Sequence, residues 1–416
     1  MRIKLSGMHF ILPLLALLMA CGQPDEGLHL NLEKKTAVEE TTPQTPEPPE
    51  NPQTPDDPPT PEPPDLPDDF ADAPEYCVTD PYVQAYLEGV TYADWDFSST
   101  KVTDYEGGGP GNGADNPPAV TISWDASSAE GAQTLKLWDS EWSREYSLGA
   151  GVTSQAVSNL VPNDGYYYQV TDSKGNVVAE GRFKTTGALH QVFFENDVHN
   201  GRDLGGWKTL DGKTIRYRLV YRGGRVDKSY MNAAGKKEAA AVGIKAELDL
   251  REAGSASSSY FGSGVPFSCP GFGEDENYRT MLRDSSPKIK TCFEFIVKNL
   301  REGKPVYFHC AAGRDRTGTI AALLLALLGV REGDIAKDYE LTYFAPDEWS
   351  MSTNHDTNTR YYNHTRIVGS YTRLVQYIRD QDKHSSRTLA GGARQYLLNI
   401  GVSSTDIDDF ISIMLQ

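Results

Sequence analysis

Residues 305–328 read PVYFHCAAGRDRTGTIAALLLALL and decide the architecture of the C-terminal half of the chain. The first residues form an apolar, β-rich run of strand length, and the last ten have the pattern of a buried helix. Cys310 and, six positions later, Arg316 lie between these two runs. In a loop between a strand and a helix, successive backbone N–H groups can point at one anion. The stretch therefore predicts an α/β domain with an anion-binding loop.

The residue types in this loop suit attack on a bound phosphate. Gly313 allows a tight turn, and the planar guanidinium of Arg316 can hold two phosphate oxygens. Arg316 and the helix N-terminus also favour the thiolate form of Cys310 at neutral pH. A thiolate beneath the phosphate can attack phosphorus in line and form a phosphocysteine, which water then hydrolyses. The hydroxyl of Thr317 is placed to hydrogen-bond the sulfur and to stabilise it as a leaving group.

Four motifs, in the same order, resemble those of a known enzyme family. The loop matches the H-C-x5-R-[ST] pattern of cysteine-dependent protein tyrosine phosphatases. Residues 200–206 (NGRDLGG) resemble the N-x-R-D-L-G-G motif of the bacterial tyrosine/lipid phosphatase family, and residues 249–251 (DLR) resemble its D-L-R strand end. Residues 221–225 (YRGGR) are similar to its Y-R-S-G-x motif, with Gly223 in place of Ser. The resemblance covers about residues 190–416.

The resemblance implies a central sheet flanked by helices and the hydrolysis of phosphomonoesters, without a metal or another cofactor. It implies that Cys310 is the nucleophile, that Asp315 acts as acid and then as base, and that Arg316 binds phosphate. The other phosphate-binding residues that it implies are Ala311, Ala312, Gly313, Arg314, Thr317 and Gly318. Supporting roles fall to His309, Arg202 and Asp203.

Two assignments of the general acid remain open at this point. In this family the acid is usually the Asp just before the loop Arg, which is Asp315 here. Other tyrosine phosphatases use an Asp on a mobile loop upstream of the Cys, and Asp275 and Asp284 are the candidates of that kind. Neither stands in the Trp-Pro-Asp context that marks such a loop, so we favour Asp315.

The residues around the loop also have alternative roles. Arg314 stands where the family commonly has Lys, so it either reads a second phosphate on an inositol ring or is a solvated charge at the loop rim. Arg202 and Asp203 either support the site, with the Asp orienting the loop or an Arg, or belong to a structural turn. His309 is expected to brace the loop through hydrogen bonds.

Residues 115–187 show short alternating runs separated by turn residues, which is typical of an all-β sandwich. Trp124 fits a core tryptophan. The LVP at 160–162 and the YYYQV at 166–170 together resemble the corner of fibronectin type III domains. Such domains usually act as spacers or as modules that bind glycans or proteins. We expect a spacer, and the sequence does not identify a partner for it.

The first 21 residues indicate export. Arg2 and Lys4 precede a short apolar run, which is too short for a spanning helix and is typical of a signal peptide. The run ends in LMAC, which resembles a bacterial lipobox with lipid attachment at Cys21. We therefore expect a lipoprotein anchored in a bacterial membrane, at the outer membrane or the cell surface, with the lipid bilayer as a partner.

A linker is expected to follow the anchor. Residues 22–75 carry 15 acidic side chains and two lysines, and 12 of the 25 residues from 43 to 67 are proline. Such a segment has little to bury and stays extended. We expect residues 76–114 to form an irregular connection from this linker to the β-rich region.

The charge of the chain argues against binding of nucleic acid. The formal net charge of the 416 residues is −18, and the excess of acid lies in the first half. Residues 190–416 carry 28 acidic and 30 basic side chains and are nearly neutral. Binding of nucleic acid requires a basic footprint, which this balance does not provide.

The remaining features of the catalytic half are a polar, aromatic segment at 343–366 and helical patterns after it. The segment forms either a lid over the substrate or a surface loop. Apolar residues at helical spacing predict packed helices at roughly 367–381, 388–398 and 403–415. A Cys269–Cys292 disulfide is possible in an exported protein, although a buried thiol fits Cys292 better.

The sequence therefore predicts an exported phosphatase that acts on phosphotyrosine proteins through a phosphocysteine. A phosphoinositide or inositol polyphosphate phosphatase is the alternative with the same chemistry. A surface binding module with an inactive phosphatase domain is the alternative of another class, and the intact Cys310, Asp315 and Arg316 argue against it.

Overall fold

The computed structural model describes residues 70–92, 102–105, 116–194, 198–227, 230–345, 367–384 and 387–415. The chain separates into two units, residues 1–59 and 60–416, and every described residue belongs to the second. The expected signal peptide with Cys21, most of the proline-rich linker, and the segment 346–366 lie outside the described residues. Within the described ranges, no helix has the length and apolar character needed to cross a membrane.

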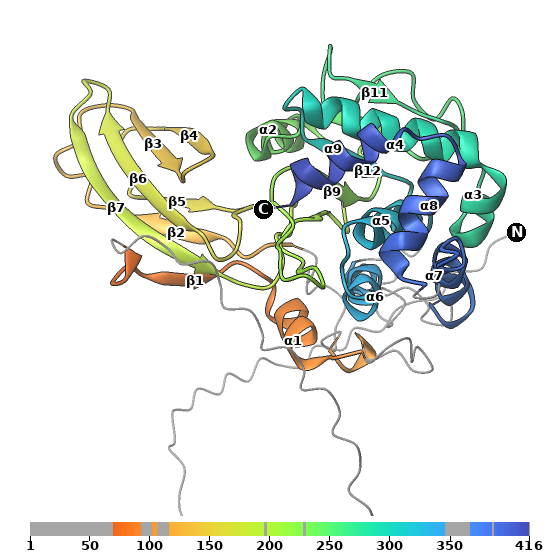
Figure 1. Ribbon diagram of the computed structural model, residues 1–416. Helices are drawn as coiled ribbons and strands as arrows, with labels where there is room; N and C mark the ends of the chain where they lie inside the picture. Colours follow the sequence, from red (N-terminus) through yellow and green to blue (C-terminus); the bar gives the residue numbers. More distant parts are fainter. Residues whose placement is uncertain are drawn as a thin grey trace, which may run out of the picture. The chain divides into compact units, whose positions relative to one another are not determined.

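The first part of the described chain is rich in β-strands (Figure 1). A five-stranded sheet has the order β1-β7-β6-β3-β4, and β2 pairs with β5 in a two-stranded sheet. The strands are β1 (Glu75–Cys77), β2 (Val120–Ser123), β3 (Gln133–Trp138), β4 (Ser143–Leu148), β5 (Ser154–Val157), β6 (Gly165–Asp172) and β7 (Val177–Thr186). Buried and accessible residues alternate along β2 and β3, and the buried ones from both sheets share one apolar cluster around Leu135, Val157 and Tyr166.

The structure differs from the sequence prediction over residues 76–114, where an irregular connection was expected. Strand β1 adds to the β-rich region by pairing parallel with β7. Helix α1 (Pro81–Gly89) follows, and the 3-10 turn η2 (Val102–Asp104) comes later. The helix begins where its sequence favours a start, because the Asp80 side chain accepts hydrogen bonds from the first-turn amides and Pro81 occupies the first helical position.

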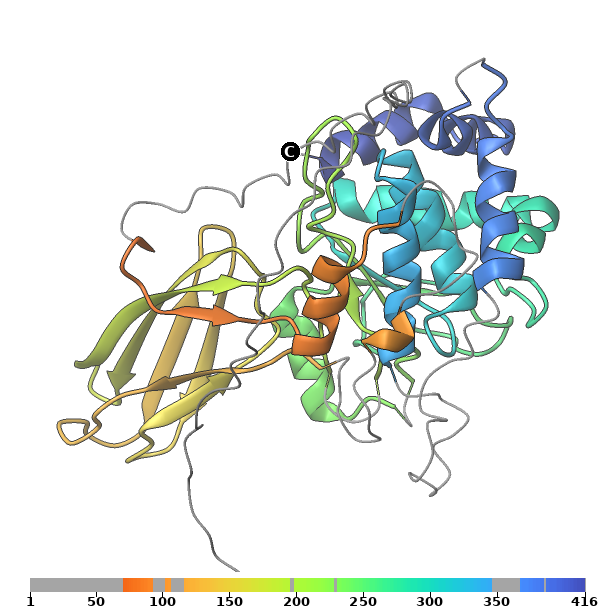
Figure 2. The same cartoon turned by 90° about the horizontal axis from the view of Figure 1, so that it is seen from below.

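The second part of the described chain has a central sheet with helices on both faces (Figures 1 and 2). The strand order is β11-β10-β12-β9-β8, with β10, β12, β9 and β11 parallel and β8 antiparallel to β9. The strands are β8 (Arg202–Asp203), β9 (Val220–Gly223), β10 (Ala246–Asp249), β11 (Phe267–Ser268) and β12 (Val306–His309). This mixed α/β architecture agrees with the predicted fold class.

The helices follow the strands in the order that a parallel sheet requires. They are α2 (Ala233–Val242), α3 (Tyr278–Asp284), α4 (Ser286–Arg301), α5 (Asp315–Leu327), α6 (Glu332–Glu340), η3 (Leu341–Phe344), η6 (Ile367–Tyr371), α7 (Thr372–Arg379), α8 (Leu389–Asn399) and α9 (Ser404–Met414). The last three coincide closely with the helices that the apolar spacing predicts.

Each face of the central sheet packs against a different apolar cluster, because successive side chains of a strand point to opposite faces. Tyr221 of β9 and Tyr307 of β12 pack on the α2 side with Val242. Val220 and Phe308 point to the opposite face, where α4, α5 and α8 contribute to the largest apolar cluster. The central strand β12 is buried throughout, which fits a parallel strand covered on both faces.

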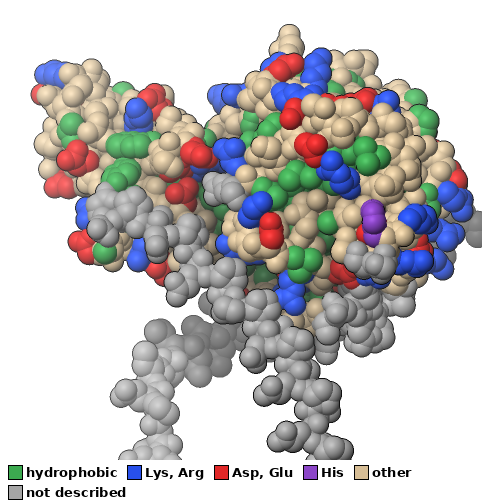
Figure 3. All heavy atoms as spheres, viewed as in Figure 1, with side chains coloured by type: hydrophobic (Ala, Val, Ile, Leu, Met, Phe, Trp, Pro, Cys, Tyr) green, Lys and Arg blue, Asp and Glu red, His purple; other side chains and the backbone are tan. Residues whose placement is uncertain are grey.

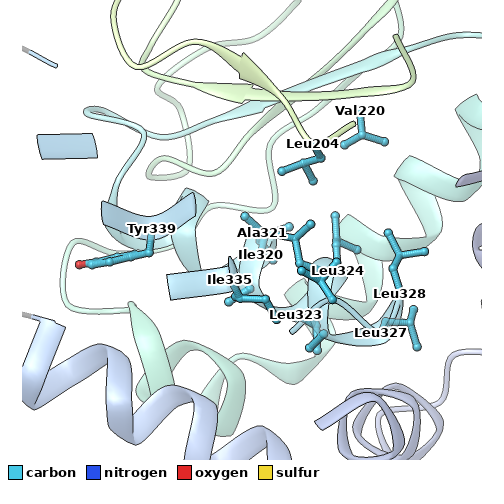
Figure 4. Packing of buried hydrophobic residues seen from close by; sticks show 14 of the residues in the cluster. Leu204, Val220, Ile320, Ala321, Leu323, Leu324, Leu327, Leu328, Ile335 and Tyr339 are labelled. Carbon is cyan, nitrogen blue, oxygen red and sulfur yellow. The ribbon is translucent and has the colours of Figure 1, made fainter. Parts of the chain in front are cut away.

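Helix α5 is the centre of this large cluster, and nearly all of its residues are buried. Figure 4 shows its side chains gathered against Leu204 and Val220, with Ile335 of α6 beside them. A helix that is apolar on all sides is expected to lie inside a domain rather than on its surface. The burial of α5 fixes its first turn firmly, and that turn follows the candidate site.

The surface agrees with the near-neutral charge of the catalytic half. On the face drawn in Figure 3, basic and acidic side chains lie interspersed over this part of the molecule. The four described cysteines, Cys77, Cys269, Cys292 and Cys310, are free thiols. The disulfide considered for Cys269 and Cys292 is therefore not formed in this structure.

Candidate active site

The Cys310–Arg316 segment connects the central strand β12 to the buried helix α5. The strand ends at His309 and the helix begins at Asp315, so the loop between them sits at the carboxyl end of a parallel sheet. Ligands of open α/β sheets bind at this edge. Cys310 is almost fully buried at the start of the loop, with 3% of its surface exposed.

Three successive carbonyl groups of the loop are held by donors outside it. The Ala311 oxygen accepts from the backbone N–H of Arg225 at 3.0 Å. The Ala312 oxygen accepts from Nδ2 of Asn200 at 3.1 Å, and the Gly313 oxygen accepts from Nη2 of Arg222 at 2.7 Å.

The orientation of these carbonyls fixes the orientation of the amides. In a trans peptide the N–H points opposite to the C=O, so the amides that follow each carbonyl point to the inside of the loop. Among the described residues, the amides of Ala312 and Gly313 have no acceptor. A cluster of inward N–H groups at a helix N-terminus is suited to bind an anion.

Gly313 is required by this arrangement. Its φ is +73°, in the left-handed region that favours glycine. A Cβ at this position would lie 2.5 Å from the backbone carbon and oxygen of Gly223. The loop therefore packs directly against the backbone at the end of β9, and a larger residue would displace it.

Arg316 places its guanidinium beside the thiol. Its Nη1 donates to Oε1 of Glu252 at 2.5 Å and to the Phe272 carbonyl at 3.1 Å. Burial lowers the pKa of Arg316, but the nearby Cys310 and Glu252 outweigh burial and raise it. The side chain of Glu252 is 43% exposed, so this ion pair can be exchanged for a bound phosphate.

Thr317 lies in the first turn of α5 with its side chain fully buried. Its Oγ1 has no hydrogen-bond partner among the described residues. The predicted bond to the Cys310 sulfur is not formed here. A buried hydroxyl without a partner is costly, and a role in catalysis is one explanation for such a group.

Asp315 accepts hydrogen bonds from two side chains. Its Oδ1 accepts from the hydroxyl of Tyr278 and from Nε of Arg314 at 3.2 Å. Its Oδ2 accepts from Nη2 of Arg314 at 3.3 Å. The Arg314 side chain is only 10% exposed, so the structure does not place it as a solvated charge at the rim.

The two upstream candidates for the general acid are both exposed. Asp284 pairs with its neighbour Arg283 at the end of α3, and this pairing lowers the pKa of Asp284. Asp275 lies in a turn before α3. The structure brings only Asp315 of the three candidates into the loop.

Arg202 and Arg222 share one buried carboxylate beneath the loop. Nε of Arg202 donates to Oδ1 of Asp338 at 2.9 Å, and Nη1 of Arg222 donates to Oδ2 at 2.5 Å. Arg202 also donates to the side chain of Asn200, which holds the Ala312 carbonyl. Burial and the neighbouring Arg222 lower the pKa of Arg202 to about 10, well above neutral pH. Arg202 therefore supports the loop through Asn200.

Asp203 is directed away from the loop. Its Oδ1 accepts from the Gly205 amide at 2.8 Å, and its Oδ2 accepts from the Arg218 amide at 2.6 Å and lies 3.0 Å from Nδ1 of His190. These contacts fit the alternative in which Asp203 belongs to a structural turn. They do not fit the alternative in which Asp203 orients the loop.

His309 is fully buried behind Cys310. Its Nε2 lies 3.1 Å from Oε1 of Glu247, and its Nδ1 lies 3.3 Å from the Cys310 carbonyl. Glu247 in turn accepts from the Ser259 hydroxyl and the Tyr260 amide. This geometry suits a bracing role. The described residues contain no group of three or more His, Cys, Asp or Glu placed to hold a metal ion.

The comparison with protein families decides the assignment. The model of a family described as "Tyrosine phosphatase family" matches residues 195–266 and 273–416, which is more than half of the chain. The chain belongs to this family.

Relatives with curated names agree with the family. A putative tyrosine-protein phosphatase of Cupriavidus necator is 30% identical over 172 residues, covering 36% of this chain and 62% of the relative. A tyrosine-protein phosphatase of Nostoc commune is 31% identical over 136 residues, covering 32% of this chain and 46% of the relative. The chain thus spans less than two thirds of either relative. The crystal structure of TpbA from P. aeruginosa matches with 18% identity and a TM-score of 0.25, covering 33% of this chain and 78% of that one.

The tyrosine phosphatase loop uses residues to which the sequence assigned no role. Asn200 and Arg222 stand inside the motifs quoted above, so their motifs were the available signal. Glu252 and Tyr278 lie 64 and 37 positions from their partners in the loop, and no local pattern marks them.

Gly223, where the family commonly has Ser, also has a structural explanation. A Cβ at this position would lie 2.1 Å from the Tyr307 hydroxyl. That hydroxyl donates to the Gly224 carbonyl at 2.8 Å. Tyr307 thus occupies the space that a serine side chain at 223 needs.

Proposed function

We propose that this member of the tyrosine phosphatase family hydrolyses phosphomonoesters through a phosphocysteine intermediate. The observation that carries the proposal is the outward orientation of the Ala311, Ala312 and Gly313 carbonyls. It directs the loop amides inward next to Cys310 and Arg316, so that thiol, amides and guanidinium converge on one anion.

The first step transfers the phosphoryl group to sulfur. The loop amides and Arg316 bind the three terminal oxygens, after Arg316 leaves Glu252. The Cys310 thiolate attacks phosphorus, an S–P bond forms, and the bond from phosphorus to the ester oxygen breaks. Asp315 gives its proton to the departing oxygen, which leaves as an alcohol.

The second step regenerates the enzyme. Asp315, now a carboxylate, takes a proton from a water molecule that attacks phosphorus. The S–P bond breaks, inorganic phosphate forms, and sulfur leaves as thiolate. The buried Thr317 hydroxyl is available to donate a hydrogen bond to that sulfur.

Phosphotyrosine in proteins is the proposed substrate, and the names of the two relatives support it. A phosphoinositide or inositol polyphosphate is the alternative. Arg314 is the residue on which that alternative depended, and its guanidinium is largely buried and donates to Asp315. This pairing gives no specific support to a second phosphate site at Arg314.

For the β-rich region we propose a fibronectin type III-like sandwich. In support, the Val161 amide donates to the Tyr166 hydroxyl at 2.9 Å, which is the contact expected of a tyrosine corner. Trp124 is buried and its Nε1 donates to Gln133 at 2.8 Å. The proposed role of this region is that of a spacer.

We also propose that the chain is an exported lipoprotein with a membrane anchor at Cys21. The support is the sequence alone, with its basic start, apolar run and LMAC ending. Metabolic labelling with a fatty acid tests it, since Cys21→Ser should abolish labelling while leaving phosphatase activity intact.

Phosphate release by the chain from residue 70 to 416, with chelator present, tests the enzymatic proposal. The substrates are a phosphotyrosine peptide, a phosphoserine peptide, a phosphoinositide and inositol hexakisphosphate, and Cys310→Ser is the control. We expect release from the phosphotyrosine peptide that is lost in the variant. Faster release from either inositol substrate would favour the alternative, and no release from any of the four by folded protein would favour a binding module.

A further inference from the structure

Tyr278 reaches the general-acid candidate from a separate helix. It is the first residue of α3, it is 4% exposed, and its hydroxyl donates to Oδ1 of Asp315. The same hydroxyl lies 2.5 Å from the hydroxyl of Tyr339 in α6. Two buried tyrosines thus form a hydrogen-bonded chain that ends on the carboxyl group of Asp315.

The backbone of Tyr278 is attached to the same turn. Its amide donates to Oγ1 of Thr319 at 2.9 Å, and that hydroxyl donates to the Asp315 carbonyl at 2.8 Å. One residue of α3 therefore holds Asp315 at two points, at its side chain directly and at its backbone through Thr319. A side chain fixed in this way loses rotational freedom before substrate binds.

The conformation of Tyr278 is unusual for its residue type. Its φ is +48°, in the left-handed region where a bulky aromatic residue is an outlier. Such a conformation is unfavourable and persists only where surrounding contacts impose it. Here it allows the amide and the hydroxyl of one residue to reach the first turn of α5 together.

The hydroxyl of Tyr278 remains protonated at neutral pH. Burial raises the pKa of Tyr278 well above its usual value, and the neighbouring Tyr339 and Asp315 raise it further. The hydroxyl can donate to the carboxylate form of Asp315, while Arg314 also donates to both carboxyl oxygens.

We propose that Tyr278, oriented by Tyr339, is a positioning residue that fixes the carboxyl group of Asp315 for proton transfer. This inference rests on the proposed phosphatase function. Tyr278 holds Oδ1 and so limits the rotation of the carboxyl group that exchanges the proton with the leaving group and the water. A misplaced carboxyl group still exchanges protons, but less efficiently.

The test is Tyr278→Phe in the full chain, which removes the hydroxyl and keeps the ring. The substrates are p-nitrophenyl phosphate, whose leaving group needs little protonation, and phenyl phosphate, whose leaving group needs much more. We expect kcat/KM, which reports the transfer to Cys310, to fall about tenfold or more on phenyl phosphate and less than about threefold on p-nitrophenyl phosphate. The basic limb of the pH profile should move to higher pH, because the carboxylate of Asp315 has lost a donor.

Tyr396→Phe is the matched control. Tyr396 is also buried, and its hydroxyl donates to the Leu282 carbonyl of α3 at 2.7 Å. The control should lose comparable stability without changing the ratio of the two substrates. Equal losses of kcat/KM on both substrates in Tyr278→Phe, with an unmoved pH profile of kcat/KM, would overturn the inference.

A second measurement separates this inference from the proposed function. Carbon-detected NMR can follow the titration of the Asp315 carboxyl group in the wild type and in Tyr278→Phe. We expect the midpoint to move to higher pH in the variant, and an unchanged midpoint would contradict the positioning role. If the wild type is inactive on both substrates and the midpoint still differs between the wild type and Tyr278→Phe, the proposed function is refuted and the contact of Tyr278 with Asp315 is kept.

Discussion

Thr317 is the residue whose state in the structure most directly predicts a step of the reaction. Its hydroxyl is buried and unpartnered, so Thr317→Val removes no existing bond and should leave thermal stability unchanged or slightly raised. The departing thiolate would lose a donor worth about 1–3 kcal/mol, which slows phosphocysteine breakdown about ten- to a hundredfold. Rapid-quench kinetics should therefore show a burst of the first product in the variant. Absence of a burst, with unchanged turnover, would show that Thr317 does not assist the sulfur.

Local sequence pattern marked the residues of the loop but not most of the side chains that hold the loop in place. The Cys310 to Arg316 loop was predicted because strand, glycine turn and buried helix are contiguous in sequence. The general-acid support by Tyr278 was not predicted, since a contact across 37 positions leaves no periodic signal. Asp203 sits in the same motif as Arg202, yet adjacent residues of a strand point to opposite faces, and only Arg202 reaches toward the loop.

Among the elements, α6 supports the loop through one side chain. Asp338 is fully buried, and although burial raises its pKa, Arg202 and Arg222 outweigh burial and lower it. Its stabilising charge is present above the pKa of an unfolded aspartate and is lost as pH falls through the lowered value. Asp338→Asn leaves two buried arginines without a counter-charge, so we expect a loss of about 3–5 kcal/mol in urea unfolding.

The control for this prediction is Asp284→Asn, which removes an exposed pair with Arg283. It should change stability by less than about 0.5 kcal/mol. Asp338→Asn should also weaken inhibition by inorganic phosphate, because Arg222 holds the Gly313 carbonyl. A variant as stable as wild type at neutral pH would mean that the two arginines have other counter-charges.

Asp164, the residue before β6, has a carboxyl group whose effect on stability has the opposite pH dependence. Burial, helped by the nearby Asp139, raises the pKa of Asp164 to about 6, against the attraction of Arg218. The folded state thus binds this proton more tightly than the unfolded state, and this contribution to stability rises as pH falls from 7 toward 4. Asp164→Asn should stabilise the protein by about 1–3 kcal/mol at pH 7.5.

The pH dependence distinguishes this effect from a simple gain in packing. Asp164 accepts from the Gly165 amide at 2.8 Å, and an asparagine oxygen can keep that bond. Melting temperatures of the two proteins should therefore converge as pH falls to about 4 and below, where Asp164 becomes protonated in the unfolded chain as well as in the folded protein. A constant difference from pH 4 to 8 would argue against titration of Asp164.

At the scale of the whole molecule, the catalytic core begins before the family motifs. Residues 81–92 and 102–105, which were expected to be irregular, contribute buried side chains to the same apolar cluster as α5. Val83, Tyr86, Leu87 and Val90 have helical spacing after a capping Asp80, so the local signal existed. What the sequence could not show is the partner of this face. The partner is α6, where Tyr86 donates to Oε2 of Glu340 at 2.5 Å and Tyr92 donates to the same oxygen.

A chain that begins at residue 190 should therefore not fold stably. It lacks seven side chains of the core cluster, which are Val83, Tyr86, Leu87, Val90, Tyr92, Val102 and Leu189. At about 1.5–3 kcal/mol each, their burial contributes roughly 10–20 kcal/mol, which is at least comparable with the total stability of a domain at about 5–15 kcal/mol. The truncation also leaves the buried Glu340 without the hydroxyl donors of Tyr86 and Tyr92.

Three chains resolve this point, starting at residues 70, 116 and 190 and all ending at 416. The first should melt cooperatively and be active, and the other two should be poorly soluble or melt far lower, because both lack α1. The chains that start at 116 and at 190 differ by the β-rich region. If the chain from 116 is stable and the chain from 190 is not, the lost stability comes from the β-rich region and not from α1. If the chain from 190 is as stable and active as the chain from 70, the contacts of α1 with α6 are dispensable, and the catalytic domain begins where the family motifs begin.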